Sequence, residues 1–421
     1  MMKPEVSSDV STLVEHLFRH TYGKLTAQLT SIFGVRMLSS IEDIVSETLL
    51  SAMHNWSYHG IPDNPEAWLF RSCRNKAIDF IRKEKTAKNY ADRIAEFDKR
   101  IENQFEASLS HEVTDDILKM MLYCCHPALS SQSQIALTLK TVAGFSIKEI
   151  ASAYFEPEAN IAQRITRAKR TLKEQNEQFD ELTPEIIQNR FLTLIQVLYM
   201  MFNEGYYSQS SDKIIRTDLI LESIRLVELL IPIANKQKSE LYGLIALFYF
   251  HASRLPARIS NTAEMILLKD QDRSLWDKEL INKGFSFFNQ SIGGDSLSEY
   301  HLYASIAASH CSAEAYEKTD WDSILKSYDM LIEMKSSSLL KLNRAVVIKE
   351  LQGASRAFEE IEDISEDPFI DTYYLFHAVK ASLLVSNGNN SEAIEAYQKA
   401  IDLTSSEVEK KFLEKQIEKI R

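Results

Sequence analysis

Apolar residues recur at helical spacing along most of this chain, and that pattern limits its fold more than any other feature. One example is Ile147, Ile150, Ala151 and Tyr154, whose spacing i, i+3, i+4, i+7 places them on one face of an α-helix. The chain has 421 residues but only 11 Gly and 9 Pro, which favours long helices over many strands joined by turns. We therefore predict an all-α protein.

Residues 144–173 (GFSIKEIASAYFEPEANIAQRITRAKRTLK) predict two short helices joined by a tight turn. Pro157 ends the first helix because it lacks an amide hydrogen and disfavours helix at the residue before it. The second helix starts near Asn160, a good N-cap, and buries Ile161 and Ile165 while its cations face outward. This pattern is typical of a helix-turn-helix, whose second helix enters the DNA major groove. A plain helical corner is the alternative for this stretch alone.

A second cationic stretch lies nearer the N-terminus. Residues 40–56 predict a helix with Ser40 as N-cap and acidic residues in its first turn, where the helix dipole favours anions. Residues 54–65 (HNWSYHGIPDNP) predict a loop, and a helix with one cationic face follows. Aromatic rings beside cations suit unpaired bases and their phosphates. The alternatives are that Trp56 packs the loop onto its own domain and that the cations form a solvated helix face.

These blocks, taken in order, resemble a bacterial RNA polymerase sigma factor of the sigma-70 family in its extracytoplasmic-function form. The motifs are EDIVSETLLSAMHNW, NPEAWLFRSCRNKAIDFIRKEK and, after a linker, GFSIKEIASAYFEPEANIAQRITRAKRTL. The resemblance implies a protein that binds core polymerase, recognises the −35 and −10 promoter elements and starts transcription. One departure is Phe155 in the turn, where such families often have Gly. The implied domains are region 2 (residues 1–88), a linker (89–112), region 4 (113–178) and a C-terminal extension (183–421).

The resemblance also implies functional residues. Those expected to bind polymerase lie on the acidic helix: Asp43, Ser46, Glu47 and Leu50. Those expected at the −10 element are Asn55, Trp56, Tyr58, His59, Asn64, Arg71, Arg74, Lys76, Arg82 and Lys83. Those expected at the −35 element are Glu158, Asn160, Gln163, Arg164, Arg167, Lys169 and Arg170. Gln163 and Arg164 are expected at base edges, whereas Arg167, Lys169 and Arg170 are expected at phosphates, which position the protein without specifying sequence.

The extension predicts helix after helix and a weak internal repeat. Small and large residues alternate in residues 343–364 and 383–403 (around Gly353 and Gly388), as in tetratricopeptide helix pairs; generic α-hairpins are the alternative. The resemblance to a sigma-factor subgroup with such an extension implies regulation in cis and a protein or peptide partner for the repeats. In LLKDQDRSLW, we expect Asp270 or Asp272 to cap a helix and Trp276 to be buried core.

Composition narrows the function further. The net charge of −12 disfavours binding to negatively charged DNA by this protein alone, so a larger partner is expected to supply much of the affinity. The apolar runs are too short to span a bilayer and the N-terminus has no apolar signal core, which predicts a cytoplasmic protein.

Candidate metal and catalytic sites are lacking in the sequence. The four cysteines have no zinc-site spacing; Cys124, Cys125 and His126 lack a second ligand pair. We expect no metal, no cofactor and, because no catalytic motif occurs, no enzyme. The rival functions are a polymerase-independent helix-turn-helix regulator with a tetratricopeptide sensor, and a helical scaffold. The first leaves the acidic helix and its cationic neighbour without a role, and the second leaves both cationic clusters unexplained.

Overall fold

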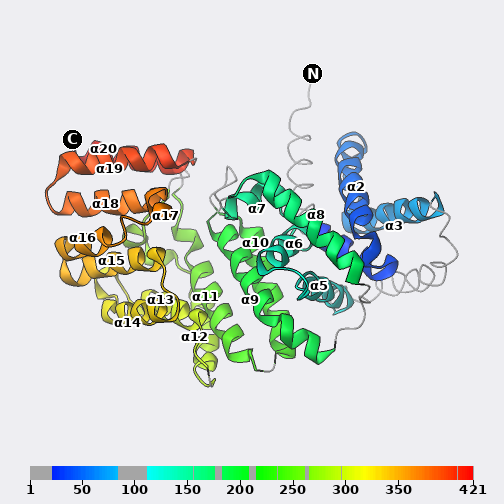
Figure 1. Cartoon of the computed structure of the whole chain (residues 1–421), viewed down its shortest axis with the longest axis horizontal. Helices are drawn as coiled ribbons and strands as arrows, with labels where there is room; N and C mark the ends of the chain where they lie inside the picture. Colours follow the sequence, from blue (N-terminus) through cyan, green and yellow to red (C-terminus); the bar gives the residue numbers. More distant parts are fainter. Residues whose placement is uncertain are drawn as a thin grey trace. The chain divides into compact units, whose positions relative to one another are not determined.

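A computed structural model of the chain is helical throughout, apart from turns and one isolated bridge between Ile259 and Met265 in the part that it describes (Figure 1). This confirms the all-α prediction. The described residues are 21–83, 111–154, 156–175, 183–207, 215–234, 236–260, 265–294, 296–404 and 406–420. No described helix has both the length and the apolar character needed to cross a membrane. The chain forms two compact units, Met1–Leu229 and Leu230–Arg421.

The first unit starts with a helix at residues 21–33. Its further elements are η1 (Val35–Met37), α2 (Leu38–His59), α3 (Pro65–Lys83), α5 (His111–Cys124), α6 (Ser131–Thr141), α7 (Ile147–Tyr154), α8 (Glu158–Gln175), α9 (Pro184–Tyr206) and α10 (Thr217–Leu230). The second unit contains η3 (Ile231–Ile233), α11 (Lys238–Ser253), η4 (Leu255–Ala257), η5 (Leu268–Asp270), η6 (Arg273–Leu275), α12 (Lys278–Ser291), α13 (Glu299–Ser312), η7 (Tyr316–Lys318), α14 (Trp321–Met334), α15 (Ser338–Gln352), α16 (Ala354–Glu362), α17 (Pro368–Asp371), α18 (Tyr374–Ser386), α19 (Asn390–Leu403) and α20 (Glu407–Ile420).

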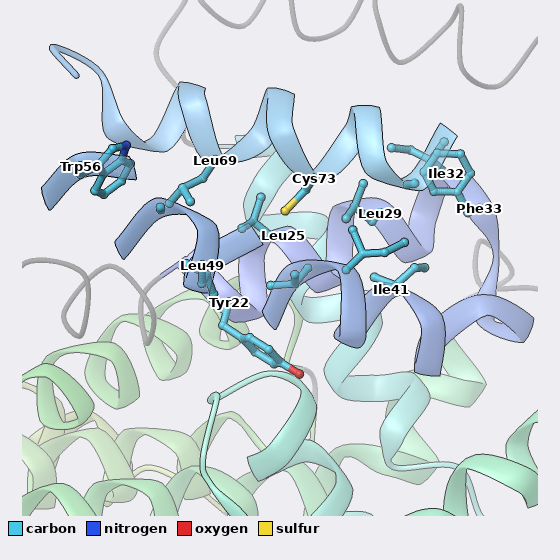
Figure 2. Packing of buried hydrophobic residues seen from close by; sticks show 14 residues of the cluster. Tyr22, Leu25, Leu29, Ile32, Phe33, Ile41, Leu49, Trp56, Leu69 and Cys73 are labelled. Carbon is cyan, nitrogen blue, oxygen red and sulfur yellow. The ribbon is translucent and has the colours of Figure 1, made fainter. Parts of the chain in front are cut away.

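The helix at residues 21–33 packs with α2 and α3 around one apolar cluster. Figure 2 shows Leu69 and Cys73 of α3 pointing toward the other two helices, where Leu25 and Leu49 lie. All four side chains are at most 1 % exposed. Burial of this apolar surface fixes α3, with its cations, against the acidic helix α2.

Helix α2 is longer than the sequence predicted at both ends. It begins at Leu38 with Met37 at the N-cap position, so the predictions of Ser40 as N-cap and of acidic residues in the first turn are wrong. It continues through the aromatic segment to His59, so the predicted loop over residues 54–65 is wrong in its first half. The helix ends at Gly60, whose φ of 82° is favourable only for residues without a side chain. Trp56 holds the last turns in place because its buried ring packs edge-on to Trp68 at 5.5 Å between ring centroids.

The remaining helices of the first unit form a second bundle. Ser130 caps α6 by accepting a hydrogen bond from the Ser133 amide at 3.4 Å. Helix α9 packs on α5 and α6, and it adds the buried side chains Phe191 and Leu194. The helix that follows the helix-turn-helix in the chain therefore completes the same bundle.

The second unit consists of helices that pack against their neighbours in the chain, including the pairs α11–α12, α13–α14, α15–α16 and α18–α19. The two segments with the small/large pattern form the helix pairs α15–α16 and α18–α19, which fits both the tetratricopeptide prediction and its alternative of generic α-hairpins. Gly353 and Gly388 occupy their turns with φ of 91° and 82°. Ala357 and Ala393 are fully buried at the helix contacts, where a small side chain permits close approach.

Candidate nucleic-acid and polymerase interface

Helices α7 and α8 form the helix-turn-helix that the sequence predicts, but α8 begins at Glu158, so Asn160 lies inside the helix and is not its N-cap. A capping box starts α7: the Ser146 amide donates to Glu149 Oε2 at 2.7 Å, and the Glu149 amide donates to Ser146 Oγ at 3.1 Å. Ile161 and Ile165 of α8 are buried, so the opposite face of α8 is presented outward. Phe155 in the turn lies outside the described residues.

The outward face of α8 carries most of the residues expected at the −35 element. Five of them are exposed: Glu158, Asn160, Gln163, Arg167 and Arg170. Arg164 lies differently, because its Nη2 donates to both carboxylate oxygens of Glu156 at 2.8 Å. Its guanidinium also lies over the Tyr154 ring, 5.5 Å from the centroid. In this state Arg164 is held against the turn.

Lys169 is engaged by a residue from the N-terminal bundle. Its Nζ donates to Glu42 Oε2 of α2, and Thr141 Oγ1 donates to the other carboxylate oxygen at 3.0 Å. The Glu42 side chain is 8 % exposed and that of Lys169 is 18 % exposed. Nearby, Lys140 lies over the Tyr22 ring, 5.7 Å from its centroid. The buried carboxylate of Glu42 thus pairs with Lys169, which the sequence analysis expected to contact a DNA phosphate.

The residues expected at the −10 element divide into exposed and structural groups. Asn55, Tyr58, His59 and Arg71 are exposed, and Tyr58 is 75 % exposed. Trp56 is 3 % exposed, so it packs its own domain, which was the alternative expectation for it.

The other members of this set lie on α3 or at its start. Asn64 Oδ1 accepts the Ala67 amide at 3.0 Å and so caps α3. Arg74 is half-buried and its Nη1 donates to Asn75. Lys76 is 3.1 Å from Glu47. Arg82 and Lys83 are in the last turn of α3, and their side chains lie outside the described part.

The residues expected to bind polymerase form one outward surface of α2. Asp43 and Glu47 are exposed, Ser46 is half-buried, and Leu50 is 64 % exposed. The structure brings the four residues together as the helical spacing required.

Comparison with known families assigns both bundles. Residues 17–87 match the family described as Sigma-70 region 2, and residues 119–172 match Sigma-70, region 4. The chain is a sigma factor of the sigma-70 family. The acidic helix α2 and the cationic helix α3 therefore belong to region 2, and the helix-turn-helix belongs to region 4.

The sigma factor continues into a further family. Residues 190–292 match a group described as "Family of unknown function (DUF6596)". A curated relative, Uncharacterized protein R00370 of Rhizobium meliloti (strain 1021), is 32 % identical over 387 residues. That similarity covers 91 % of this chain and 90 % of the relative, so the relative shares the sigma regions together with the extension.

Region 4 of this sigma factor is tied to the segment that follows it. Arg216, just before α10, donates to Glu149 Oε1 at 2.5 Å and lies 4.0 Å from Glu204 of α9. Its guanidinium lies over the Phe145 ring, 5.3 Å from the centroid. The Arg216 side chain is only 3 % exposed. Because Glu149 also caps α7, this arginine fixes the first helix of the helix-turn-helix.

The same contact is reinforced along α9. Arg190 Nη1 donates to the Leu122 carbonyl oxygen at 3.0 Å, and Thr193 Oγ1 donates to Gln134 Oε1 at 3.2 Å. The sequence analysis did not predict the contacts that Glu42, Arg190 and Arg216 make with region 4. No local pattern marks them, because each acts on a partner far away in the chain.

Proposed function

We propose that this protein is an extracytoplasmic-function sigma factor whose C-terminal extension, residues 183–421, regulates it in cis. Region 2 binds core RNA polymerase through Asp43, Glu47 and Leu50 and engages the −10 element through Tyr58 and the α3 cations. Region 4 recognises the −35 element through α8. The factor catalyses no reaction itself and acts in the cytoplasm, where its polymerase and promoter DNA are.

The observation that carries regulation in cis is the burial of Arg216 against Glu149. A buried guanidinium between two carboxylates is strongly coupled to both, and one of these carboxylates caps the helix-turn-helix. Movement of α9 and α10 would therefore change the position of α7. We infer that a signal received by the tetratricopeptide-like repeats reaches region 4 through these two helices.

The DNA-reading surface also supports a regulated state. Arg164 is paired with Glu156, and Lys169 is paired with Glu42 of region 2. Both cations must leave these carboxylates before they contact a promoter. We infer that binding to polymerase, which uses the same helix α2, separates Glu42 from Lys169. This is the reason for proposing that DNA reading follows polymerase binding; a polymerase-independent regulator would leave region 2 without a role.

Run-off transcription with purified core polymerase tests the regulatory proposal. Deleting the extension after region 4 would remove Phe191 and Leu194 from the bundle core and so destabilise region 4 itself. A point variant of the full chain therefore tests regulation more specifically. Arg216→Gln breaks the link to Glu149. Arg225→Gln is the matched control, because Arg225 of α10 pairs only with Glu222 of its own helix among the described residues.

The expected result is a several-fold change in transcript yield for R216Q, with core polymerase still captured in a pull-down and with R225Q unchanged. Transcription by R216Q equal to that of the wild type would overturn regulation through this contact. If the wild-type chain does not bind core polymerase in the pull-down, the proposed sigma-factor function itself is wrong.

A further inference from the structure

Two arginines of the second unit converge on one buried indole. Arg254, at the end of α11, and Arg273 of η6 place their guanidinium carbons 5.3 Å and 4.6 Å from the centroid of the Trp276 ring. Trp276 is 4 % exposed and Arg254 is 9 % exposed. Gln271 and His310, both 8 % exposed, complete the arginine cluster.

The two guanidinium groups differ from three other arginines of the described part that pair with carboxylates. Arg216 pairs with Glu149 at 2.5 Å, Arg164 with Glu156 at 2.8 Å, and Arg344 with Asp329 at 2.6 Å. Among the described residues, no carboxylate lies within 4.0 Å of the nitrogens of Arg254 or Arg273. Arg254 is buried and Arg273 is half-buried, and Glu317 acts on Arg273 only from beyond ion-pair distance. A guanidinium removed from water without a contacting anion is unfavourable, so the positive charge of the cluster is only partly compensated.

Contacts within the fold explain only part of this arrangement. Arg273 Nη1 donates to the carbonyl oxygens of His310 and Ala313 at 2.5 and 2.7 Å, which satisfies the C-terminus of α13. Arg254 Nε reaches Gln271 Oε1 only at 3.4 Å. Three buried polar atoms of the cluster have no hydrogen-bond partner among the residues that the structure describes: Arg273 Nη2, Trp276 Nε1 and His310 Nδ1.

Donors outnumber acceptors among the polar groups of the arginine cluster. Burial, and then the charges of Arg254 and Arg273, lower the pKa of His310 to about 3, so its ring is neutral at physiological pH. Arginine and the indole nitrogen only donate hydrogen bonds, and Gln271 Oε1 already accepts from Arg254. The neutral His310 ring offers one acceptor nitrogen at most, so a ligand that enters the cluster meets mainly donors and the charges of two arginines, which favours an anionic acceptor.

We propose that Arg254, Arg273 and Trp276 form a binding site for the oxyanion group of a small ligand, either a phosphate or a carboxylate. The planar guanidinium matches both groups with paired hydrogen bonds. A dianionic phosphate is the better fit because it compensates both cations. The three residues lie within residues 190–292, the segment that matches the family of unknown function. This site is independent of promoter recognition, so each can fail without the other.

Thermal unfolding of the full chain tests the site with inorganic phosphate, with succinate as a carboxylate probe, and with sodium chloride at matched ionic strength. A ligand at one hundred times its Kd is expected to raise the Tm of the second unit by about 5 °C. Arg254→Gln and Arg273→Gln should each abolish the rise. Arg356→Gln is the matched control, because Arg356 is exposed and pairs with Glu359; it should retain the full rise.

The outcomes separate cleanly. A rise with phosphate alone, with succinate alone, or with both supports an oxyanion site and identifies the preferred group. No rise beyond that of sodium chloride overturns the proposal, as does equal loss in R356Q. Because Arg273 also holds the end of α13, R254Q decides the result if circular dichroism shows that R273Q is misfolded. If a folded R254Q variant shows the same rise in Tm as the wild type, the proposed site is wrong.

Discussion

Glu42 of region 2 and Lys169 of the recognition helix form an ion pair that links the two DNA-reading regions. Thr141 donates to the same carboxylate, and both charged side chains are largely removed from water. An ion pair in such surroundings is sensitive to the loss of either member, because the remaining charge stays buried without compensation. The pair therefore reports directly on the contact between regions 2 and 4.

Replacing this acid should loosen the contact. Glu42→Gln is expected to destabilise the contact by about 3 kcal/mol, seen as faster amide hydrogen exchange in α8 and at the end of α6. Glu47→Gln on the same helix is the control, because its pair with Lys76 is exposed and such pairs contribute less than about 1 kcal/mol. Equal exchange in the two variants would contradict a specific role for Glu42.

The two aromatic residues near the end of α2 should separate folding from DNA opening. Trp56→Ala is expected to destabilise region 2 by about 3–5 kcal/mol because it empties a buried site. Tyr58→Ala should change stability by less than about 0.5 kcal/mol, since the ring is 75 % exposed, yet reduce promoter melting. Urea unfolding and permanganate reactivity of the melted strand measure the two effects. A Y58A variant that melts the promoter normally would remove Tyr58 from the −10 surface.

Arg164 should matter for the promoter and not for polymerase. In Arg164→Ala, the loss of a base contact is expected to lower transcription by about tenfold, since each such contact contributes about 1–3 kcal/mol of discrimination. Capture by core polymerase should stay at the wild-type level because the proposed binding surface lies on α2. Run-off transcription and a pull-down on the same preparation measure both. An equal decrease in transcription and in polymerase capture would contradict the assignment of Arg164 to promoter recognition.

Glu409 gives the second unit a predictable pH dependence. Burial raises the pKa of this carboxyl from 4.5 to about 7, and the hydroxyls of Tyr374 and Thr404 donate to it. The folded state therefore binds a proton more tightly than the unfolded state. The stabilisation is fully present below about pH 4.5 and is lost as pH rises through about 7. The loss amounts to at most about 3 kcal/mol.

Thermal unfolding from pH 5 to pH 8 tests this dependence. In the wild-type chain, the Tm of the second unit should fall between pH 5 and pH 8. Glu409→Gln keeps a neutral side chain of the same shape at every pH, so that part of the fall should disappear. Glu407→Gln, an exposed position two residues earlier, is the control and should retain the wild-type dependence. An identical pH profile in wild type and E409Q would show that Glu409 does not titrate in this range.

Local features of the fold were predictable because their causes are local. Helical spacing of apolar residues gave α7 its bounds, Ile147–Tyr154, and the N-cap at Ser130 follows from a hydroxyl that reaches the amide of Ser133 three residues later. Pro157 marks the turn between α7 and α8 because it lacks an amide hydrogen and disfavours helix at the residue before it. The order of two motifs sufficed to indicate the sigma-factor family, and the family comparisons confirmed it.

Other features depended on contacts between distant residues, which no sequence window contains. Glu42 and Lys169 are 127 residues apart, and Arg216 and Glu149 are 67 apart. The loop predicted around Trp56 failed because packing against Trp68 outweighed the turn-forming residues near it. The sequence alone thus determined most of the helices and the family, since those follow from neighbouring side chains. Only the tertiary structure decided which charges are paired, because burial and distance set the strength of an ion pair.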